Sequence, residues 1–524
     1  MAGGKVSDNP IRNIVIVGGG TAGWLTAGVI AAEHMAHSKH GISVTLIESP
    51  DVKPIGVGEG TWPTMRGTLR KMGVTETDFI RCCDATFKQG AKFAKWVTGA
   101  KDDAYYHPLV LPQGYEQINL APFWQQQADH IPFADAVSFQ GQICERDLAP
   151  KQNTTPEFAH VANYAYHLDA GKFAAFLQQH CTEKLGVKHI LDTVIAINSH
   201  DSGDICSLST KQHDEINGDL FIDCSGFHAL LIGKHYQIPF INKKHILFND
   251  AALAVQVPYS DPQSPIASHT ISTGQSAGWI WDIGLPTRRG VGHVYSSAHI
   301  SDDQAEMELR QYIRDSIGDK VDDLKVRKIP IVPGHRETFW HKNCVAVGLS
   351  AGFLEPLEAS ALVLVELSAA MISEQLPATR KIMDIVAKRF NDKFRYRWDR
   401  IIDFLKLHYV LTQRTDSDYW LDNCQTETIP DGLTELLELW QHHSPWHSDF
   451  TQTDEVFPSA SYQYVLYGMG FKTQQPKTSR RSNNQNIALE NFRKNQQMTE
   501  KLLRGLPTNR ELINKIQQFG LQRI

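Results

Sequence analysis

The sequence has no apolar run long enough to cross a membrane and no block of basic residues. No segment approaches the roughly 18 uninterrupted apolar residues of a membrane span, and the opening MAGGKVSDNPIRN lacks the apolar centre of a signal peptide. Asp and Glu (58) outnumber Lys and Arg (52), so the formal charge is −6. These absences predict a protein without membrane or nucleic-acid partners.

Cysteine is scarce and scattered. The eight cysteines include no C-x-x-C pair, so we expect neither a metal site nor a disulfide framework. Free thiols are typical of a reducing compartment, and we predict a cytoplasmic protein. The chain of 524 residues, 42 % apolar and 21 % charged, has an ordinary globular composition and room for two interleaved modules.

A glycine-rich turn near the N-terminus predicts a dinucleotide-binding site. The β-branched run Ile14–Val17 indicates a buried strand, GGGTAG follows at 18–23, and a helix is expected over 24–34. A second strand over 42–47 ends at Glu48. Such glycines let a pyrophosphate approach the helix N-terminus, and the acid accepts a ribose hydroxyl. The predicted cofactor-binding residues here are Gly18, Gly20, Thr21, Ala22, Gly23 and Glu48.

Two later segments favour FAD over NAD as the dinucleotide. GDLFIDCSG (218–226) and NCVAVG (343–348) each predict a strand that runs into a turn of small residues. A chain that returns three times to one nucleotide is typical of flavoprotein hydroxylases, so Gly348 joins the predicted site. The alternative to a nucleotide-binding role, for each segment taken alone, is that these are unrelated strands of one sheet. We find no second nucleotide-binding fingerprint that would bind NAD(P)H.

Six motifs, in order along the chain, resemble those of the flavin-dependent tryptophan halogenase family. Taken alone, the two tryptophans of GWIWDI indicate only core packing, because residues i and i+2 share one face of a strand. The set covers most of the chain through about residue 470. The motifs are GGGTAGW (18–24), GVGEGTWP (56–63), TFKQGAKFAKW (86–96), HP (107–108), GWIWDI (278–283) and EPLEAS (355–360).

Two positions depart from the family pattern. Gly284 stands where the family has a proline after W-x-W-x-I, which changes the expected turn. Family members that take free tryptophan carry paired tyrosines, and here Gln463 separates Tyr462 from Tyr464. The chain therefore looks closer to the halogenases that take simpler indoles.

The resemblance implies an α/β fold, namely the FAD-binding, Rossmann-like fold of flavoprotein monooxygenases with an interleaved substrate module and a mostly helical C-terminal part. We predict an FAD-binding module over residues 1–400, with inserted substrate-module segments at about 101–154 and 236–319. A helical substrate module is expected over 401–524, and the polar, basic stretch 474–485 predicts a loop.

The resemblance also implies a reaction. Reduced FAD and oxygen give a flavin hydroperoxide, a halide attacks its distal oxygen, and the resulting hypohalous acid halogenates an indole or another electron-rich ring. A separate flavin reductase would supply FADH2 by diffusion. Bromide or chloride would serve, with bromide at least as good because it is easier to oxidise and desolvate. The ring position and a homodimer are left open.

Two charged residues would carry the catalysis in this family. Lys88 matches the lysine that receives hypohalous acid, either by hydrogen bonding or as a haloamine. The haloamine route needs a neutral amine, so desolvation would have to lower a pKa of about 10.4. Glu358 matches the glutamate that orients the oxidant and takes the ring proton. The backbone N–H groups of Ser360 and Ala361 would hold the halide, and the candidate substrate residues are His107, Trp446 and Tyr462.

Two other functions share these motifs in part. An FAD-dependent aromatic hydroxylase needs the same fold but not Lys88 with Glu358. A catalytically inactive flavin-binding module needs neither residue. Halogenated product, hydroxylated product or no product would separate the three.

Overall fold

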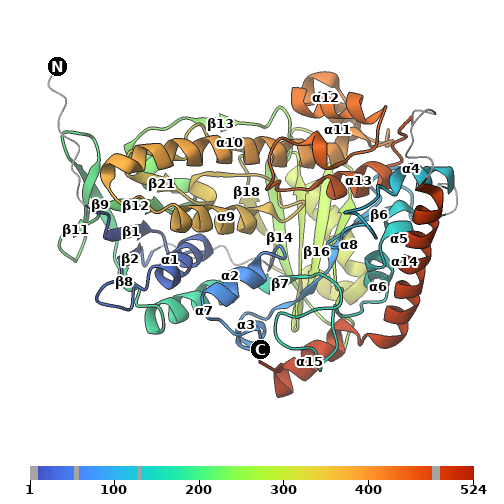
Figure 1. Ribbon diagram of the computed structural model, residues 1–524, viewed down its shortest axis with the longest axis horizontal. Coiled ribbons are helices and arrows are strands. Elements are labelled where there is room, and N and C mark those ends of the chain that lie inside the picture. The colour runs from blue at the N-terminus through green and yellow to red at the C-terminus, as the bar shows by residue number, and fades with distance from the viewer. Residues whose placement is uncertain (1–9, 52–57, 128–130, 475–483, 524) are drawn as a thin grey trace. The chain divides into compact units, whose positions relative to one another are not determined.

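The structure, a computed structural model, describes residues 10–51, 58–127, 131–474 and 484–523 (Figure 1). The chain divides into two compact units, and each unit is built from three separate stretches of sequence. The first unit comprises Met1–Asp84, Leu168–Lys243 and Val332–Trp398, and the second comprises Ala85–His167, Lys244–Ile331 and Asp399–Ile524.

A six-stranded sheet forms the centre of the first unit. Five neighbouring strands are parallel, and only β20 at the edge runs antiparallel. The strands predicted at 14–17, 42–47, 218–226 and 343–348 are neighbours here, which confirms the Rossmann-like α/β fold. In spatial order they are β20 (Trp340–His341), β21 (Cys344–Ala346), β12 (Leu220–Asp223), β1 (Asn13–Val17), β2 (Ser43–Glu48) and β8 (Lys188–Leu191).

Helices α1 (Thr21–Glu33), α7 (Ala170–Glu183) and α9 (Ser360–Glu374) pack together in the first unit, with α1 in contact with both others. Because neighbours surround it, α1 is buried without interruption from Gly23 to Ala31. The remaining elements of this unit are small: α2 (Met65–Lys71), α3 (Glu76–Cys82), β3 (Gly58–Gly60), the antiparallel sheet of β9 (Val194–Ser199), β10 (Ile205–Thr210) and β11 (Ile216–Asn217), and the sheet of β13 (Phe240–Asn242), β19 (Gly334–Arg336) and β22 (Gly352–Phe353).

A seven-stranded sheet forms the centre of the second unit. Its pairs are antiparallel, except that β15 and β5 run parallel. Helix α8 (Asp302–Ile317) covers one face, where Leu309 packs with Val255 and Ile280. The strand order is β18 (Arg327–Pro330), β14 (Ala251–Pro258), β17 (Arg288–Tyr295), β16 (Gly278–Gly284), β15 (Thr270–Gly274), β5 (Gly90–Ala94) and β6 (Ala104–Pro108).

Strand β4 (Thr86–Lys88) pairs with β7 (Ala165–Asp169) outside that sheet. Helix α10 (Arg380–Val410) begins in the first unit and ends in the second. The helical module predicted over 401–524 includes α12 (Asp431–Trp440), and the predicted loop at 474–485 falls mostly outside the described residues. The other helices of the second unit are α4 (Ala121–Trp124), α5 (Phe133–Val137), α6 (Gln140–Glu145), α11 (Asp418–Asn423), α12 (Asp431–Trp440), α13 (Ser459–Gly468), α14 (Gln485–Gly505) and α15 (Asn509–Phe519).

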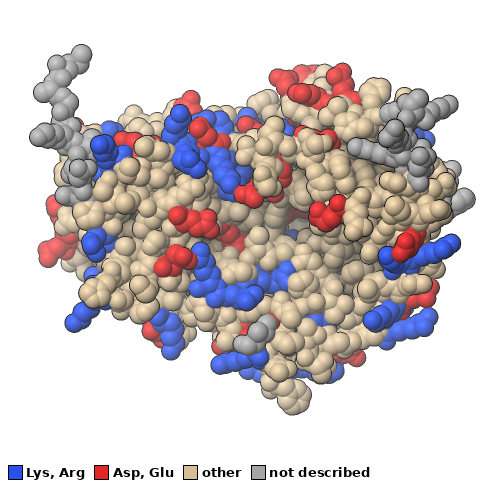
Figure 2. Space-filling view, in the orientation of Figure 1, with Lys and Arg blue, Asp and Glu red and all other residues tan. Residues whose placement is uncertain are grey.

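Surface charge is mixed on the face shown in Figure 2, where basic and acidic side chains are interspersed. Within the described residues, no helix combines the length and the apolar character needed to cross a membrane. The eight cysteines are all free thiols, and five of them are buried: Cys83, Cys144, Cys181, Cys224 and Cys344.

Candidate active site

The predicted glycine turn lies at the carboxyl end of β1, directly before α1. Gly18 has φ of +116°, and a Cβ there would lie 2.2 Å from the carbonyl oxygen of Cys224. A Cβ on Gly23 would lie 1.9 Å from the carbonyl oxygen of Gly18. At Gly20, by contrast, a Cβ would meet no atom of the described residues within 4 Å. The backbone is therefore packed at positions 18 and 23 and open at position 20, where a phosphate would approach.

The start of α1 has the properties of an anion site. Its N-cap residue, Gly20, has no side chain to cap the first-turn N–H groups, and the first turn contains no acidic residue. Uncapped N–H groups and the helix dipole both favour a bound anion. The turn therefore fits the pyrophosphate of a dinucleotide.

Glu48 and Gly348 lie beside this turn, as predicted. The Glu48 side chain covers Gly19, where a Cβ would come within 1.6 Å of Oε2. Gly348 has φ of +73°, and a Cβ there would lie 2.8 Å from the Cβ of Ala22. Because β1, β2, β12 and β21 are parallel, their carboxyl ends meet at one edge, as in nucleotide-binding sheets.

One partner of Glu48 could not be expected from the sequence alone. His189 of β8 places Nε2 2.7 Å from Oε1 of Glu48. The two residues are brought together by the parallel pairing of β2 with β8. A histidine in an unremarkable strand carries no local signal, so only the sheet order reveals this contact.

Glu358 lies in the tight turn that leads into α9. The carbonyl oxygen of Pro356 accepts a hydrogen bond from the Ala359 N–H at 3.1 Å, and Ala359 is left-handed, with φ of +55°. Glu358 is only 7 % exposed. The helix that follows has an alanine N-cap without a side-chain acceptor and no acid in its first turn. Its first N–H groups, those of Ser360 and Ala361, therefore suit a small anion.

Segment 62–68 contacts this region in a way that the sequence did not predict. The indole Nε1 of Trp62 donates to the carbonyl oxygen of Glu358 at 2.8 Å. The hydroxyls of Thr64 and Thr68 donate to Oε1 and Oε2 of Glu366 at 3.2 and 2.6 Å. Burial raises the pKa of Glu366 to about 8, although both hydroxyls lower it. The Glu366 carboxyl group is therefore mostly protonated at pH 7.

Lys88 lies on β4 in the second unit, with 5 % of its surface exposed. In the β4–β7 ladder Thr86 faces His167 and Lys88 faces Ala165, so Lys88 and His167 are diagonal neighbours on one face. Burial, and then the charge of Lys88, lower the pKa of His167 well below its ordinary value. His167 is therefore neutral at pH 7 and does not add a positive charge beside the lysine.

The other two lysines of TFKQGAKFAKW are in different surroundings. Nζ of Lys92 lies 2.5 Å from Oε1 of Glu145, which is half exposed. Lys95 is exposed and has φ of +55°. Lys88 is therefore the buried lysine of the motif. Lys88 belongs to the second unit and Glu358 to the first.

The predicted aromatic residues fall into two clusters of the second unit. His107 is buried on β6, and its ring centroid lies 5.6 Å from that of Phe404. Tyr462 of α13 is fully buried and packs against the same Phe404 at 4.9 Å. Trp446 packs instead against Tyr115 at 4.9 Å. The structure thus joins His107 and Tyr462 through a phenylalanine of α10, and places Trp446 elsewhere.

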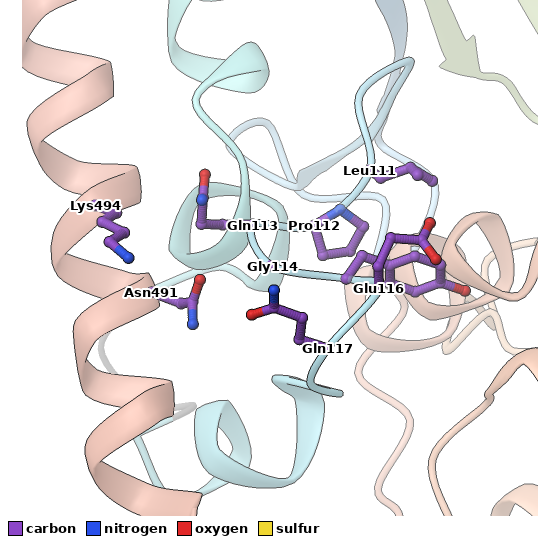
Figure 3. Close-up of a pocket in the computed structure, with 9 residues that line it drawn as sticks. Leu111, Pro112, Gln113, Gly114, Glu116, Gln117, Asn491 and Lys494 are labelled. Carbon is purple, nitrogen blue, oxygen red and sulfur yellow. The ribbon is translucent and has the colours of Figure 1, made fainter.

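An open pocket of about 400 Å³ lies beside α14 in the second unit (Figure 3). Segment 111–117 forms one wall, and Asn491 and Lys494 project from the helix on the other side. The lining contains neither Lys88 nor His107. Within the described part of the chain, no group of three His, Cys, Asp or Glu side chains could hold a metal ion.

Comparison with known proteins identifies relatives over almost the whole chain. The family model described as tryptophan halogenase matches residues 13–485. The tryptophan 6-halogenase SttH of Streptomyces toxytricini is 32 % identical over 483 residues, which covers 88 % of this chain and 90 % of that protein. The crystal structure of a tryptophan halogenase from Shewanella frigidimarina NCIMB 400 is 50 % identical, with a TM-score of 0.96 and 99 % of each chain covered. The structure of Tar14, a tryptophan C-6 flavin-dependent halogenase from taromycin biosynthesis, is 31 % identical, with a TM-score of 0.89 and coverage of 96 % and 99 %.

Substitution Gly20→Ala should weaken FAD binding without disturbing the fold. The backbone at Gly20 has φ of −76°, which alanine adopts freely, and the added methyl group enters the open side of the turn. We expect the dissociation constant of FAD to rise about tenfold, equivalent to roughly 1.4 kcal/mol, in a fluorescence titration. Gly505→Ala, which also meets no described atom within 4 Å, is the control. An unchanged FAD affinity in Gly20→Ala would contradict this site.

Acid should destabilise the fold through His269. Burial, and then Lys92, lower its pKa to about 4 from an ordinary value of 6.5, while Glu145 raises it. Between these values the unfolded chain binds a proton that the folded chain does not, so stability falls as the pH drops below 6.5. At pH 5 this side chain should cost about 2 kcal/mol. Thermal unfolding at pH 7 and pH 5 should therefore show a smaller acid-induced drop for His269→Gln than for the wild type.

Proposed function

Because the chain belongs to the tryptophan halogenase family, we propose that it halogenates an indole or a closely related ring, with Lys88 and Glu358 as the catalytic residues. It is a flavin-dependent halogenase that uses FADH2 from a separate reductase, oxygen and a halide. The observation that carries the residue assignment is burial. Lys88 and Glu358 are 5 % and 7 % exposed, so each of the two family motifs places a charged side chain where its desolvation is costly.

The cofactor site proposed here is the edge of the first unit's sheet. When bound, reduced FAD supplies with oxygen the oxidising power that converts halide to hypohalous acid. The glycine turn at 18–23 would hold the pyrophosphate at the start of α1, and Glu48 would accept a ribose hydroxyl. Gly348 would let a third segment approach the same nucleotide. Support comes from the open Cβ direction at Gly20 and the uncapped start of α1.

The halide would be held by the N–H groups of Ser360 and Ala361 at the start of α9. These groups are neither capped by the alanine N-cap nor faced by an acid in the first turn. A halide is a spherical anion with one negative charge that only accepts hydrogen bonds, so backbone N–H groups and the helix dipole suffice to bind it. Bromide should serve at least as well as chloride, because it is the easier ion to desolvate and oxidise.

Lys88 and Glu358 act after the oxidant has formed. Lys88 would receive hypohalous acid by a hydrogen bond from its ammonium group. Alternatively, the neutral amine would take the halogen as the O–halogen bond breaks, which gives a haloamine and releases water. The neutral His167 beside it adds no repulsion to either state. Glu358 would orient the oxidant and accept the proton that the aromatic carbon loses when the halogen is attached.

The substrate would lack an amino-acid backbone. On α13 the hydroxyl of Tyr464 donates to the carbonyl oxygen of Val110 at 3.0 Å. Nε2 of Gln463 donates to the carbonyl oxygen of Pro445 at 2.7 Å and to Asn119. These polar groups are used within the protein, whereas a free amino acid would need them for its carboxylate. We therefore favour indole and small indole derivatives over tryptophan.

The first unit would be the FAD-binding module and the second the substrate module. The first contains the glycine turn, Glu48 and Gly348, and the second contains Lys88 and His107. The eight free thiols support a reducing, cytoplasmic location. A homodimer stays a prediction.

Substitution Lys88→Ala should abolish halogenation while oxidation of reduced FAD continues, because the lysine acts after the oxidant has left the flavin. Glu358→Gln keeps the shape and the following N–H groups but removes the base, so halogenation should fall by about 10²–10⁴ and not vanish. The halogenated indole that each variant forms is measured by mass spectrometry after incubation with FAD, a flavin reductase, NADH, indole and bromide.

A scavenger of free hypohalous acid must be present, since the free acid halogenates indole unaided. Lys92→Ala is the matched control, because Lys92 lies in the same motif but pairs with the half-exposed Glu145. Its product yield should match the wild type. If Lys88→Ala still halogenates indole at the wild-type rate in the presence of the scavenger, the assignment of both catalytic residues is wrong.

Indole should be a better substrate than free tryptophan, because Gln463 and Tyr464 are committed to internal hydrogen bonds. The comparison is kcat/KM for indole, 3-methylindole and tryptophan under one set of flavin and halide concentrations. A clear preference for tryptophan would overturn the substrate class and leave the halogenase assignment intact.

A further inference from the structure

The turn that carries Glu358 adopts a conformation that its sequence does not favour. Ala359 is left-handed, with φ of +55° and ψ of 40°, a region that residues with a Cβ rarely occupy. Such a conformation persists only where the surrounding structure over-determines it. The turn therefore needs support from outside its own residues.

Trp62 supplies one such support. Its indole Nε1 donates a hydrogen bond of 2.8 Å to the carbonyl oxygen of Glu358, which belongs to the peptide group joining Glu358 to Ala359. A bond to this carbonyl restrains ψ of Glu358 and the orientation of the peptide plane before Ala359. The second restraint is the bond from the Ala359 N–H to Pro356 at 3.1 Å, on the other side of the same peptide group.

The Trp62 segment is itself fixed to the helix that follows the turn. Thr64 and Thr68 both donate to the buried Glu366, at 3.2 and 2.6 Å. Glu366 is 4 % exposed and lies on α9. The segment thus touches α9 through Glu366 and the preceding turn through Trp62, so the indole is held at a set position relative to the first residues of the helix.

We propose that Trp62 is a positioning residue for halogenation. Through its hydrogen bond to the Glu358 carbonyl, it keeps Glu358 and the N–H groups of Ser360 and Ala361 in fixed positions relative to one another. The inference rests on the proposed roles of Glu358, Ser360 and Ala361. These three lie on either side of Ala359, so one change in the turn displaces both the base and the halide donors.

The expected signature differs from a general loss of stability. Without the indole N–H, the turn spends part of its time in other conformations, so the halide binds more weakly and the oxidant is less often placed for transfer. The residues proposed to bind FAD are not in the turn. Oxidation of reduced FAD should therefore continue, while KM for bromide rises and the product formed per FADH2 oxidised falls.

Substitution Trp62→Phe tests the proposal, because it keeps an aromatic ring and removes the donor; the smaller ring is matched by the same change in the control below. We expect product per FADH2 oxidised to fall about fivefold, the effect of one hydrogen bond on a rate. The matched control is Trp340→Phe. Trp340 lies in the same unit and its Nε1 also donates to a backbone carbonyl, that of Lys342, at 3.1 Å. Trp340→Phe should form as much product per FADH2 oxidised as the wild type does (the product ratio), even if it lowers the unfolding temperature as much as Trp62→Phe does.

A second substitution makes the test independent of stability. Glycine adopts the left-handed region without penalty, so Ala359→Gly should restore part of the product ratio in Trp62→Phe. Thr68→Val, which removes the shorter bond to Glu366, should lower the ratio less than Trp62→Phe does, because it loosens the support and not the turn itself.

Three outcomes would overturn the proposal: a wild-type product ratio and bromide KM in Trp62→Phe, an equal loss in Trp340→Phe, or no recovery on adding Ala359→Gly. Glu358→Gln, assayed alongside, separates this failure from failure of the proposed function. If Glu358→Gln is impaired and Trp62→Phe is not, only the positioning role is lost. If neither is impaired, the catalytic assignment itself is wrong.

Discussion

The parallel pairing of β1 with β2 and β12 is the constraint on which the proposed nucleotide site depends. Parallel strands all end at the same edge of a sheet, so this one ladder collects the glycine turn, Glu48 and the turn after Asp223 from distant parts of the chain. β21 extends the ladder by one strand and adds Gly348. The positive φ values at Gly18 and Gly348 follow from this convergence, because several backbones meet where side chains do not fit.

What the sequence predicted correctly is mostly local. The β-branched run at 14–17, the glycines after it and the acid at 48 form one continuous unit, so their spacing alone indicates the strand, turn and helix. The contacts that it missed join distant segments. Trp62 bonds to Glu358 across 296 residues and Thr68 to Glu366 across 298. The motifs GVGEGTWP and EPLEAS mark Trp62 and Glu358 separately, but no local pattern indicates that the two residues are hydrogen-bonded to each other.

The difference between local patterns and contacts that join distant segments also applies to the predicted aromatic substrate residues. His107 stood out because its motif is in the family's order, and the structure places it against Phe404. Phe404 itself lies in an apolar helical stretch, IIDFLKLHY, where periodicity predicts burial but not the neighbours. Tyr462 was chosen from a tyrosine-rich segment, and the structure places it, fully buried, against the same Phe404.

Ala359, the N-cap residue of α9, combines two features that do not stabilise a helix start. Ser, Thr, Asp or Asn at an N-cap usually stabilises a helix by about 1 kcal/mol, because the side chain accepts a bond from the first-turn N–H groups. Residue 359 is left-handed, unlike the extended backbone of most capping residues, and the donors proposed for the halide have no side-chain acceptor at the N-cap. Alanine leaves them available but forgoes the cap, and it adds the strain of a left-handed residue. Both costs fall on the single residue between the proposed base and the proposed halide donors, and the proposed roles of these neighbours would account for them.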